Sequence, residues 1–274
     1  MGAEITERRV SVDGIGIFCR EIAGSGPPTI FVHGNPTNSG DWLPFLERMN
    51  GPAIAFDLPG FGRSDRPDPA RFDHTIEAYA QLLDKLFDQL APDGFKLVVH
   101  DWGGLGLIAA LRRPERVRGI VAINTVPIAS DYRWHWIAQI WRRRGLGELF
   151  NAVNTKFATA QLLRLARYKR RRVSPEFVDM VWSGWGPGMS RAVLALYRSA
   201  DPEVIRAEGA RLGELRCPAL IVWGQNDPYI GPEHGRAFAA AIPGAELIEV
   251  ERASHWPWID RPEMVDRVVA FVDG

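Results

Sequence analysis

Short apolar runs bounded by glycine, proline or polar residues recur along most of the chain. Runs of this kind are typical of buried β-strands. They occupy residues 15–22, 29–32, 53–58, 96–100, 117–124, 218–224 and 246–251. Longer stretches with apolar residues at helical spacing separate several of them, at 74–90, 103–113, 232–241 and 262–272. Strands that alternate with helices build a mostly parallel sheet with helices on both faces, so the pattern predicts an α/β fold.

The alternation of strands and helices stops after Asn124 and resumes at Pro218. A compact domain does not accommodate a structureless connection of that length. Apolar residues inside the interval repeat at helical spacing, for example Trp134, Ile137 and Trp141. We therefore expect a helical lid inserted into one core domain. The expected division is a core of residues 1–126 and 213–274 and a lid of residues 127–212.

The overall composition is that of an ordinary globular protein. The 274 residues contain 33 Lys and Arg against 33 Asp and Glu, and 46% of them are hydrophobic. A neutral chain has no general attraction for nucleic acid. No apolar run is long enough for a membrane span, and the first 25 residues lack the apolar stretch of a secretory signal. We therefore expect a cytoplasmic protein without a nucleic-acid or membrane partner, whose oligomeric state is not predicted.

The charges are unevenly distributed along this neutral chain. Residues 131–172 contain eleven Lys and Arg against Asp131 and Glu148, so the segment carries +9 and the rest of the chain carries −9. The simplest interpretation is a solvated helix face. An acidic substrate, an acidic partner or a contact between lid and core are the alternatives.

The sharpest chemical signal is the segment Leu-Val-Val-His-Asp-Trp-Gly-Gly at 97–104, where a predicted strand runs directly into a helix start. It has the form of a nucleophile elbow, a strained turn that presents one side chain above the sheet, here Asp101. A helix N-cap is the simpler reading of this aspartate. It does not explain two further loops at predicted strand ends, His-Gly-Asn-Pro at 33–36 and the segment 57–64. Open α/β sheets bind ligands at those strand ends.

A nucleophile needs a base and a group that orients the base, and two later loops offer both. Asp227 follows the strand at 218–224, and His255 follows the last strand. The order Asp101, Asp227, His255 is the nucleophile, acid and base order of α/β hydrolases. We therefore predict that these three side chains form a catalytic triad.

Several other chemistries are disfavoured by the sequence. No serine follows a strand in a G-x-S-x-G pattern, which argues against a serine esterase or peptidase. No G-x-G-x-x-G loop opens a helix, so no nucleotide site is indicated. Cys19 and Cys217 form no C-x-x-C pair, so neither a zinc site nor a disulfide framework is indicated. We expect no metal and no cofactor.

A carboxylate nucleophile is suited to attack on a saturated carbon that bears a leaving group, because the product is a stable alkyl ester. The expected substrates are small apolar alkyl halides or epoxides, with water as the second reactant. His255 would activate that water, and Asp227 would hold the imidazole. The backbone N–H groups of Asn35 and Trp102 would stabilise the oxyanion. Their side chains would stabilise a departing halide.

The segments His-Gly-Asn-Pro-Thr at 33–37 and His-Asp-Trp-Gly at 100–103 resemble those of haloalkane dehalogenases in the α/β-hydrolase superfamily. The resemblance implies an α/β-hydrolase fold with an inserted lid and hydrolysis of haloalkanes to alcohol and halide. It assigns Asp101 as nucleophile, His255 as base, and Asn35 with Trp102 as the halide-binding pair. Some of these enzymes carry the acid after the sixth strand, where this chain has Asn124, so the role falls to Asp227.

The same motifs also occur in epoxide hydrolases, which form vicinal diols and are the alternative. Those enzymes use lid tyrosines as proton donors. The lid offers Tyr132, Tyr168 and Tyr197. Haloacid dehalogenases of this fold are a third option, and they have an arginine directly after the nucleophile. This chain has Trp102 at that position, which argues against them. A catalytically silent ligand-binding protein of this fold is also considered, but such proteins usually lack a triad member.

Overall fold

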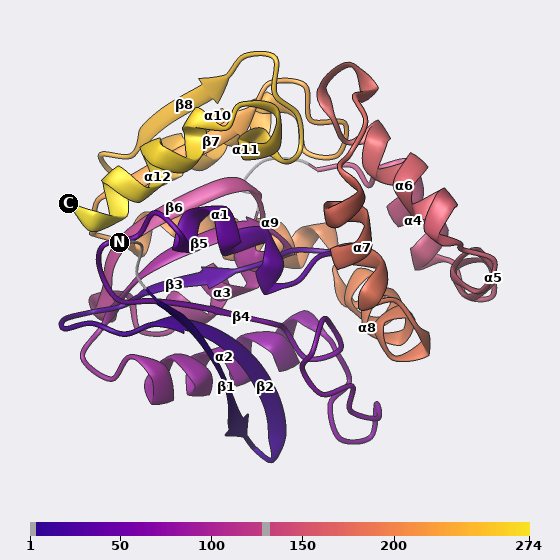
Figure 1. The fold of residues 1–274 in the computed structure, drawn as a ribbon, viewed down its shortest axis with the longest axis horizontal. Helices are drawn as coiled ribbons and strands as arrows, with labels where there is room; N and C mark the ends of the chain where they lie inside the picture. The colour runs from indigo at the N-terminus through magenta and orange to yellow at the C-terminus, as the bar shows by residue number, and fades with distance from the viewer. Residues whose placement is uncertain (1–3, 128–131) are drawn as a thin grey trace.

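The computed structural model describes residues 4–127 and 132–274, and over these ranges its strands form one eight-stranded sheet (Figure 1). The sheet order is β1-β2-β4-β3-β5-β6-β7-β8. Only the pairings of β2 with β1 and β4 are antiparallel, so the predicted mostly parallel sheet is confirmed. The strands are β1 (Ile5–Val12), β2 (Ile15–Ile22), β3 (Thr29–Val32), β4 (Ala53–Phe56), β5 (Phe95–Asp101), β6 (Val117–Thr125), β7 (Ala219–Gly224) and β8 (Glu246–Val250).

The edge strand β1 was not predicted, because its sequence lacks the apolar run that marks the other strands. Of its eight residues only Val10 and Val12 are buried. The remaining side chains are polar and largely exposed, as expected at the edge of a sheet. In the register with β2, Val10 lies opposite Ile17 and Val12 lies opposite Ile15, so the two strands share one short apolar face.

Helices cover both faces of the sheet, as the alternation of patterns predicted. Residues of α2 and α3 share one apolar core with α10, and residues of α1 share the opposite core with α11 and α12. Parallel strands are buried on both faces, which explains their continuous apolar runs. These helices are α1 (Leu43–Leu46), α2 (Ile76–Leu90), α3 (Leu105–Ala110), α10 (Pro232–Ala241), α11 (Pro257–Asp260) and α12 (Glu263–Asp273).

Between β6 and β7 the chain leaves the sheet and forms short helices, as the helical spacing in this interval predicted. We call residues 132–214 the inserted segment. Its helices are α4 (Trp136–Arg142), α5 (Leu146–Ala152), α6 (Lys156–Leu165), α7 (Pro175–Ser183), α8 (Pro187–Ser199) and α9 (Pro202–Ala210). Helices α4 to α8 lie at the right of Figure 1, over the carboxyl ends of the parallel strands, whereas α9 returns to the middle of the picture. Within the described ranges, no helix is both long and apolar enough to cross a membrane.

An aromatic cluster fills the core beneath α1 and provides a direct test of the packing. Phe45 is fully buried, and its ring centroid lies 5.2 Å from that of Trp42 and 5.6 Å from that of Trp258. We expect Phe45→Ala to lower the free energy of unfolding by about 3–5 kcal/mol, because it leaves a cavity that its neighbours cannot fill. Urea unfolding followed by circular dichroism measures the change.

The matched control is Phe157→Ala, at a phenylalanine that is 74% exposed. This substitution should change the free energy of unfolding by about 0.5 kcal/mol or less. Equal losses for the two variants would contradict the assignment of Phe45 to the core.

Candidate active site

Asp101 lies at the sharp turn between β5 and α3, in a backbone conformation that is unusual for a residue other than glycine. Its φ is 51° and its ψ is −123°. At two neighbouring glycines, Gly34 and Gly104, the surrounding atoms are too close for any side chain to fit. A Cβ added at Gly34 would lie 2.4 Å from the Cβ of Asp101, and one at Gly104 would lie 1.6 Å from the carbonyl oxygen of Val126. The glycines of the two motifs therefore leave the space in which the carboxylate stands.

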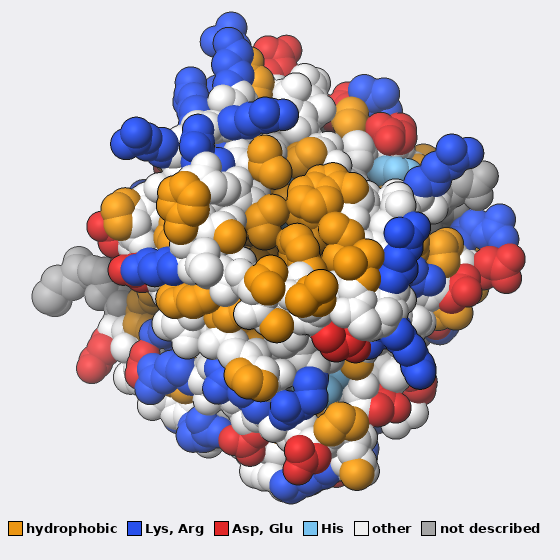
Figure 2. Space-filling model, turned by 90° about the vertical axis from the view of Figure 1, so that its right-hand side faces the viewer, with side chains coloured by type: hydrophobic (Ala, Val, Ile, Leu, Met, Phe, Trp, Pro, Cys, Tyr) orange, Lys and Arg blue, Asp and Glu red, His pale blue; other side chains and the backbone are white. Residues whose placement is uncertain are grey.

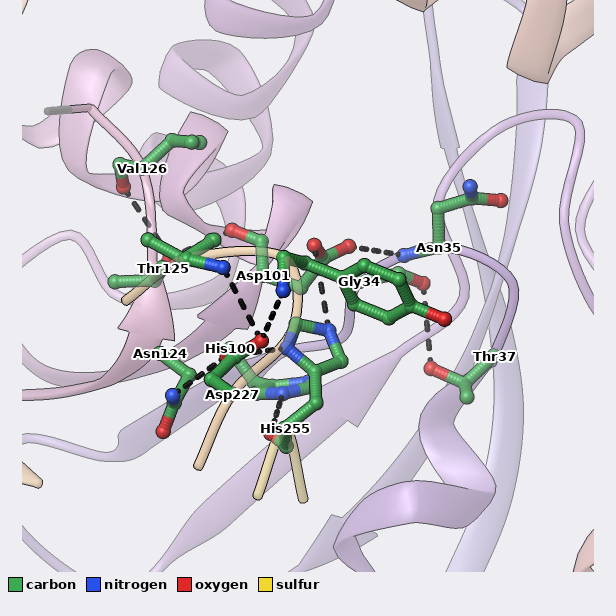
Figure 3. A network of polar contacts seen from close by, with 12 residues as sticks. Gly34, Asn35, Thr37, His100, Asp101, Asn124, Thr125, Val126, Asp227 and His255 are labelled. Carbon is green, nitrogen blue, oxygen red and sulfur yellow. Dashed lines mark hydrogen bonds and ion pairs between the residues drawn. The ribbon is translucent and has the colours of Figure 1, made fainter. Parts of the chain in front are cut away.

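The three residues predicted as a triad lie together, although they come from three separate loops (Figure 3). His255 Nδ1 donates to Asp227 Oδ2 at 2.8 Å, and His255 Nε2 lies 3.6 Å from Asp101 Oδ2. All three residues are buried. The imidazole thus stands between two carboxylates, with each ring nitrogen directed to one of them.

Asp227 accepts hydrogen bonds from three donors in addition to His255. Its Oδ1 accepts from the backbone N–H groups of Tyr229 at 2.7 Å and Ile230 at 3.1 Å. Its Oδ2 also accepts from Asn124 Nδ2 at 2.6 Å, and Asn124 Oδ1 accepts from the N–H of Gly224 at 2.9 Å. Asn124 therefore ties the end of β6 to the Asp227 loop, a positioning role that the sequence analysis missed. The sequence did contain a signal for this role, because Asn124 is a polar residue at the end of an otherwise apolar predicted strand.

Two backbone N–H groups lie beside the Asp101 carboxylate, and they are the two that the sequence analysis named. The N–H of Asn35 donates to Asp101 Oδ1 at 2.7 Å, and the N–H of Trp102 is near enough to help lower the pKa of this carboxyl. The Asn35 loop is held in place by His33, whose Nδ1 donates to the carbonyl of Gly34 and whose Nε2 accepts from the N–H of Leu58. The donors are therefore fixed before any ligand binds.

Burial and charge act in opposite directions on the pKa values of the network. Burial disfavours the charged form of His255, but the Asp227 and Asp101 carboxylates outweigh it and raise the pKa of His255 to about 10. Burial likewise opposes ionisation of Asp101, but hydrogen bonding and charge from His255 hold the pKa of that carboxyl below its usual value. The resting state is an imidazolium between two carboxylates.

A pocket with an empty volume of about 660 Å³ opens above Asp101 and His255. Most of its wall is apolar and comes from the inserted segment. The apolar wall includes Ile137, Trp141, Phe150, Leu162, Val181 and Trp185. A pocket of this composition favours a small apolar molecule whose reactive atom reaches the carboxylate.

Tyr197 on α8 is the only one of the three predicted tyrosines whose hydroxyl meets the predicted halide-binding pair. The side chains of Trp102 and Asn35 lie near enough to this hydroxyl for both to act on its pKa. The Tyr197 ring stands nearly perpendicular to that of Trp102, with centroids 5.2 Å apart. Burial keeps the pKa of Tyr197 well above its usual value, so the hydroxyl retains its proton.

The other two predicted tyrosines are placed differently. Tyr132 is near the network, but its hydroxyl donates to the carbonyl of Tyr229 at 3.2 Å. Tyr168 lies outside the pocket, in the turn after α6, where its N–H donates to Asp260 and its ring contacts Lys169. The structure therefore does not bring Tyr168 to the site, because the turn directs it to α11.

The sequence analysis missed two further residues that line the pocket. Tyr229 stacks edge-on against His255, with ring centroids 5.0 Å apart. His135 caps the start of α4 by accepting from the N–H of Ala138, and burial lowers the pKa of His135 to about 4. It is therefore a neutral imidazole facing the pocket. Only tertiary contacts bring these rings to the site, and neither belongs to a recognisable motif.

Comparison with known proteins identifies the class to which this site belongs. The sequence model for the alpha/beta hydrolase fold matches residues 27–262. A haloalkane dehalogenase from Bradyrhizobium diazoefficiens is 30% identical over 298 residues, which cover 97% of this chain and 94% of that protein. A cis-3-alkyl-4-alkyloxetan-2-one decarboxylase from Xanthomonas campestris is 27% identical over 293 residues, covering 99% and 97%. The chain therefore belongs to the α/β-hydrolase family, and within it to the homologues of the haloalkane dehalogenases.

Solved structures agree with this assignment. A haloalkane dehalogenase from Bradyrhizobium elkani superposes with a TM-score of 0.82 at 27% identity, covering 97% of each chain. The Cif epoxide hydrolase from Acinetobacter nosocomialis superposes with a TM-score of 0.83 at 18% identity, covering 97% of this chain and 88% of its own. The second likeness shows a shared fold only. The predicted α/β-hydrolase fold and the resemblance to haloalkane dehalogenases are both confirmed.

The charge balance of the network can be tested by titration. Asp101→Asn removes one of the two carboxylates that raise the pKa of His255 while keeping the side-chain shape. We expect the pKa of His255, about 10 in the unmodified protein, to fall in the variant. Nuclear magnetic resonance titration of the His255 ring measures both values. An unchanged pKa would show that Asp101 does not act on the imidazolium.

The same pKa shift implies a dependence of stability on pH. The folded-state pKa of His255 lies above the usual 6.5, so its ion pairs stabilise the fold fully below that pH. This contribution should be lost as the pH rises through about 10. The free energy of unfolding of Asp101→Asn should therefore fall less over this range than that of the unmodified protein.

Proposed function

We propose that this chain is a hydrolytic haloalkane dehalogenase with Asp101 as nucleophile, His255 as base and Asp227 as the acid of a catalytic triad. The observation that carries the proposal is the placement of Asp101 at the bottom of an apolar pocket. The backbone N–H of Asn35 donates to its carboxylate, that of Trp102 lies beside it, and His255 stands 3.6 Å from its Oδ2. A haloalkane in this pocket would present its carbon to an ionised carboxylate that needs no base to activate it.

In the first step a carboxylate oxygen of Asp101 attacks the carbon that bears the halogen. The new C–O bond forms as the carbon–halogen bond breaks, and the halide leaves with the bonding electrons. The Trp102 indole, the Asn35 amide and the Tyr197 hydroxyl lie near one another beside the pocket, and they would be the neutral donors to the departing halide. Donors that are already in place in a dry pocket stabilise the developing charge without reorganisation.

The second step depends on the change of charge that the first one causes. Alkylation converts Asp101 into a neutral ester, so one of the two carboxylates that hold the proton on His255 is lost. The pKa of His255 then falls, and the imidazole releases its proton and becomes a base. It takes a proton from water as the water oxygen attacks the carbonyl carbon of the Asp101 ester. The N–H groups of Asn35 and Trp102 would hold the resulting oxyanion.

The oxyanion collapses as the carbon–oxygen bond to the alkoxy group breaks, and the alkoxide takes the proton of the newly formed carboxyl group. The alcohol leaves, the Asp101 carboxylate is regenerated, and His255 keeps the proton that it took from water. The proton that His255 released after alkylation passes to solvent and balances the halide.

The proposal extends to the organisation of the molecule. Residues 127–212 would act as a cap over a core of 1–126 and 213–274, since the helices of the inserted segment supply the apolar pocket wall. The substrate would be a small apolar molecule that is hydrolysed by water without a cofactor. Cys19 and Cys217 are both free thiols, which supports a cytoplasmic location.

A second candidate function is the opening of a strained ring at a carbon–oxygen bond, as in an epoxide. A departing alkoxide needs a proton, whereas a halide does not. Tyr197 supports this alternative, because its protonated hydroxyl stands beside Trp102 and Asn35 where the leaving group would be. Tyr132 is not available as a second donor while its hydroxyl is bonded to Tyr229. Epoxide hydrolases use two lid tyrosines as proton donors, whereas of the three lid tyrosines only Tyr197 is available for that role here. This difference favours the dehalogenase function.

Halide release from short bromoalkanes and chloroalkanes tests the leading proposal. Asp101→Ala should remove turnover by about 10⁴-fold or more, because Asp101 is the only carboxylate among the described residues that line the pocket. His255→Gln should release about one equivalent of halide and then stop, because the ester forms and is not hydrolysed. Intact-mass spectrometry should show the alkyl adduct on this variant. Steady turnover by Asp101→Ala would contradict the mechanism.

Tyr197→Phe separates the two candidate functions. Bromoalkane turnover should fall by about tenfold or less, because two of the three halide donors remain. Any epoxide opening should be lost, since the variant has no proton donor beside the leaving oxygen. If the unmodified protein releases no halide but opens epoxides, and Tyr197→Phe removes that activity, the second function holds instead.

A further inference from the structure

The inserted segment presents an unusual number of apolar side chains to solvent. Apart from Val204, every large hydrophobic side chain that is exposed in the described ranges belongs to residues 136–157. We call these five residues the lid patch. They are Trp136 (50% exposed), Leu146 (41%), Leu149 (60%), Val153 (65%) and Phe157 (74%). Figure 2 views the side of the molecule formed by α4–α8, where apolar side chains gather in the middle of the face.

Four of the five positions lie on or beside one helix, α5. Leu146, Leu149 and Val153 repeat at three- and four-residue spacing along α5 and its end, so they share one side. Trp136 contacts Phe150, the neighbouring residue on α5, with ring centroids 6.5 Å apart. Exposed apolar patches of this kind mark interaction surfaces in monomeric proteins.

The helices that carry the lid patch are apolar on both of their sides. Their inner residues Ile137, Trp141 and Phe150 line the pocket above Asp101. The pocket accounts for the inner side. Nothing in the proposed reaction accounts for the outer side, which therefore requires a different explanation.

Positive charge borders the lid patch. Arg143 and Arg144 are exposed after α4, and the four consecutive residues 169–172 are exposed in the turn before α7. No carboxylate of the described residues forms an ion pair with any of these six side chains. Figure 2 shows Lys and Arg side chains most densely along the upper edge of this face. These six exposed cations account for part of the +9 charge of residues 131–172.

A surface groove joins the two features at the start of α6. Phe157, Ala160 and Val173 provide its apolar wall, and Arg164 and Arg172 stand at the same groove. A guanidinium next to an exposed phenylalanine fits a ligand that is anionic at one end and apolar at the other. Phospholipids with anionic headgroups have this chemistry.

We propose that the lid patch and its basic border dock onto the surface of an anionic lipid bilayer. The apolar side chains would enter the boundary between headgroups and acyl chains, and the Lys and Arg side chains would contact the headgroups. The protein would lie on the membrane without crossing it. Docking in this orientation places the helices that form the pocket wall next to the phase in which apolar substrates concentrate.

Charge favours a bilayer over a second copy of this chain as the occupant. A twofold dimer through the lid patch would place the same surface on both sides of the interface. The two basic borders would then face each other and repel. An anionic bilayer offers the opposite charge and an apolar interior together.

Co-sedimentation with vesicles tests the proposal without any substrate, so its result does not depend on the proposed reaction. One set of vesicles contains phosphatidylcholine alone, and the other contains phosphatidylcholine and phosphatidylglycerol in equal parts. We expect partition into the anionic vesicles to be stronger by about tenfold or more. High salt should remove most of this difference.

Two variants separate the contributions of the lid patch and its border. Leu149→Ser combined with Phe157→Ser should reduce binding to the anionic vesicles by about tenfold or more, through the lost apolar area. Arg170→Gln, Arg171→Gln and Arg172→Gln together should reduce the preference for anionic vesicles by about the same factor. The matched control is Val204→Ser on α9, which is exposed but outside the patch and should bind normally.

Three results would overturn the proposal. One is equal binding to both kinds of vesicle, and another is no binding to either. The third is a dimer in sedimentation velocity that the combined Leu149→Ser and Phe157→Ser variant converts to monomer, because a second copy would then cover the lid patch. Unchanged circular dichroism and unchanged halide release in each variant show that the site is intact.

Discussion

A buried cluster of one imidazolium and two carboxylates is the constraint on which the rest of the structure depends. Charges removed from water are costly unless each is paired and hydrogen-bonded. His255 pairs with Asp227 on one side and Asp101 on the other, and backbone N–H groups satisfy both carboxylates. The cluster carries a net negative charge, and alkylation of Asp101 would remove one of its members. This change of charge is what would convert His255 from an acid in the resting state into a base.

The backbone around the cluster is built to hold three charged groups from distant parts of the chain. Asp101 stands on a turn with positive φ, next to Gly34, where any side chain would collide with it. Asn124 joins the ends of β6 and β7 and donates to Asp227, so the acid loop cannot move independently. His100 packs behind the ring of His255 and donates to its carbonyl oxygen at 2.8 Å. Parallel strands make this possible, because their carboxyl ends meet at one edge of the sheet.

The inserted segment has two tasks that compete for apolar residues. Its inner side would exclude bulk solvent from the site, since the electrostatic interactions on which the proposed reaction depends are stronger in a shielded pocket. Its outer side would normally be polar, yet the lid patch is apolar and bordered by arginines and a lysine that form no ion pair within the described part of the chain. The neutral composition of the whole chain hides this surface, because +9 in one segment is balanced by −9 elsewhere. The exposed apolar residues and the nearby positive charge together indicate an interaction surface. The net charge of the whole chain does not reveal it.

By itself the sequence determined the elements and the chemistry that is local to them. Most strands were predicted to within a residue or two, and Asp101, Asp227 and His255 were identified from loops that follow strands. This succeeds because burial imprints a periodic pattern on each element and because strand ends share one edge of the sheet. Only the tertiary structure decided which lid residues reach the site. It places Tyr197 beside Trp102, directs Tyr168 to α11 and brings Tyr229 and His135 into the pocket. Helix periodicity reports which side of a helix is buried, but the packing between helices decides what that side meets.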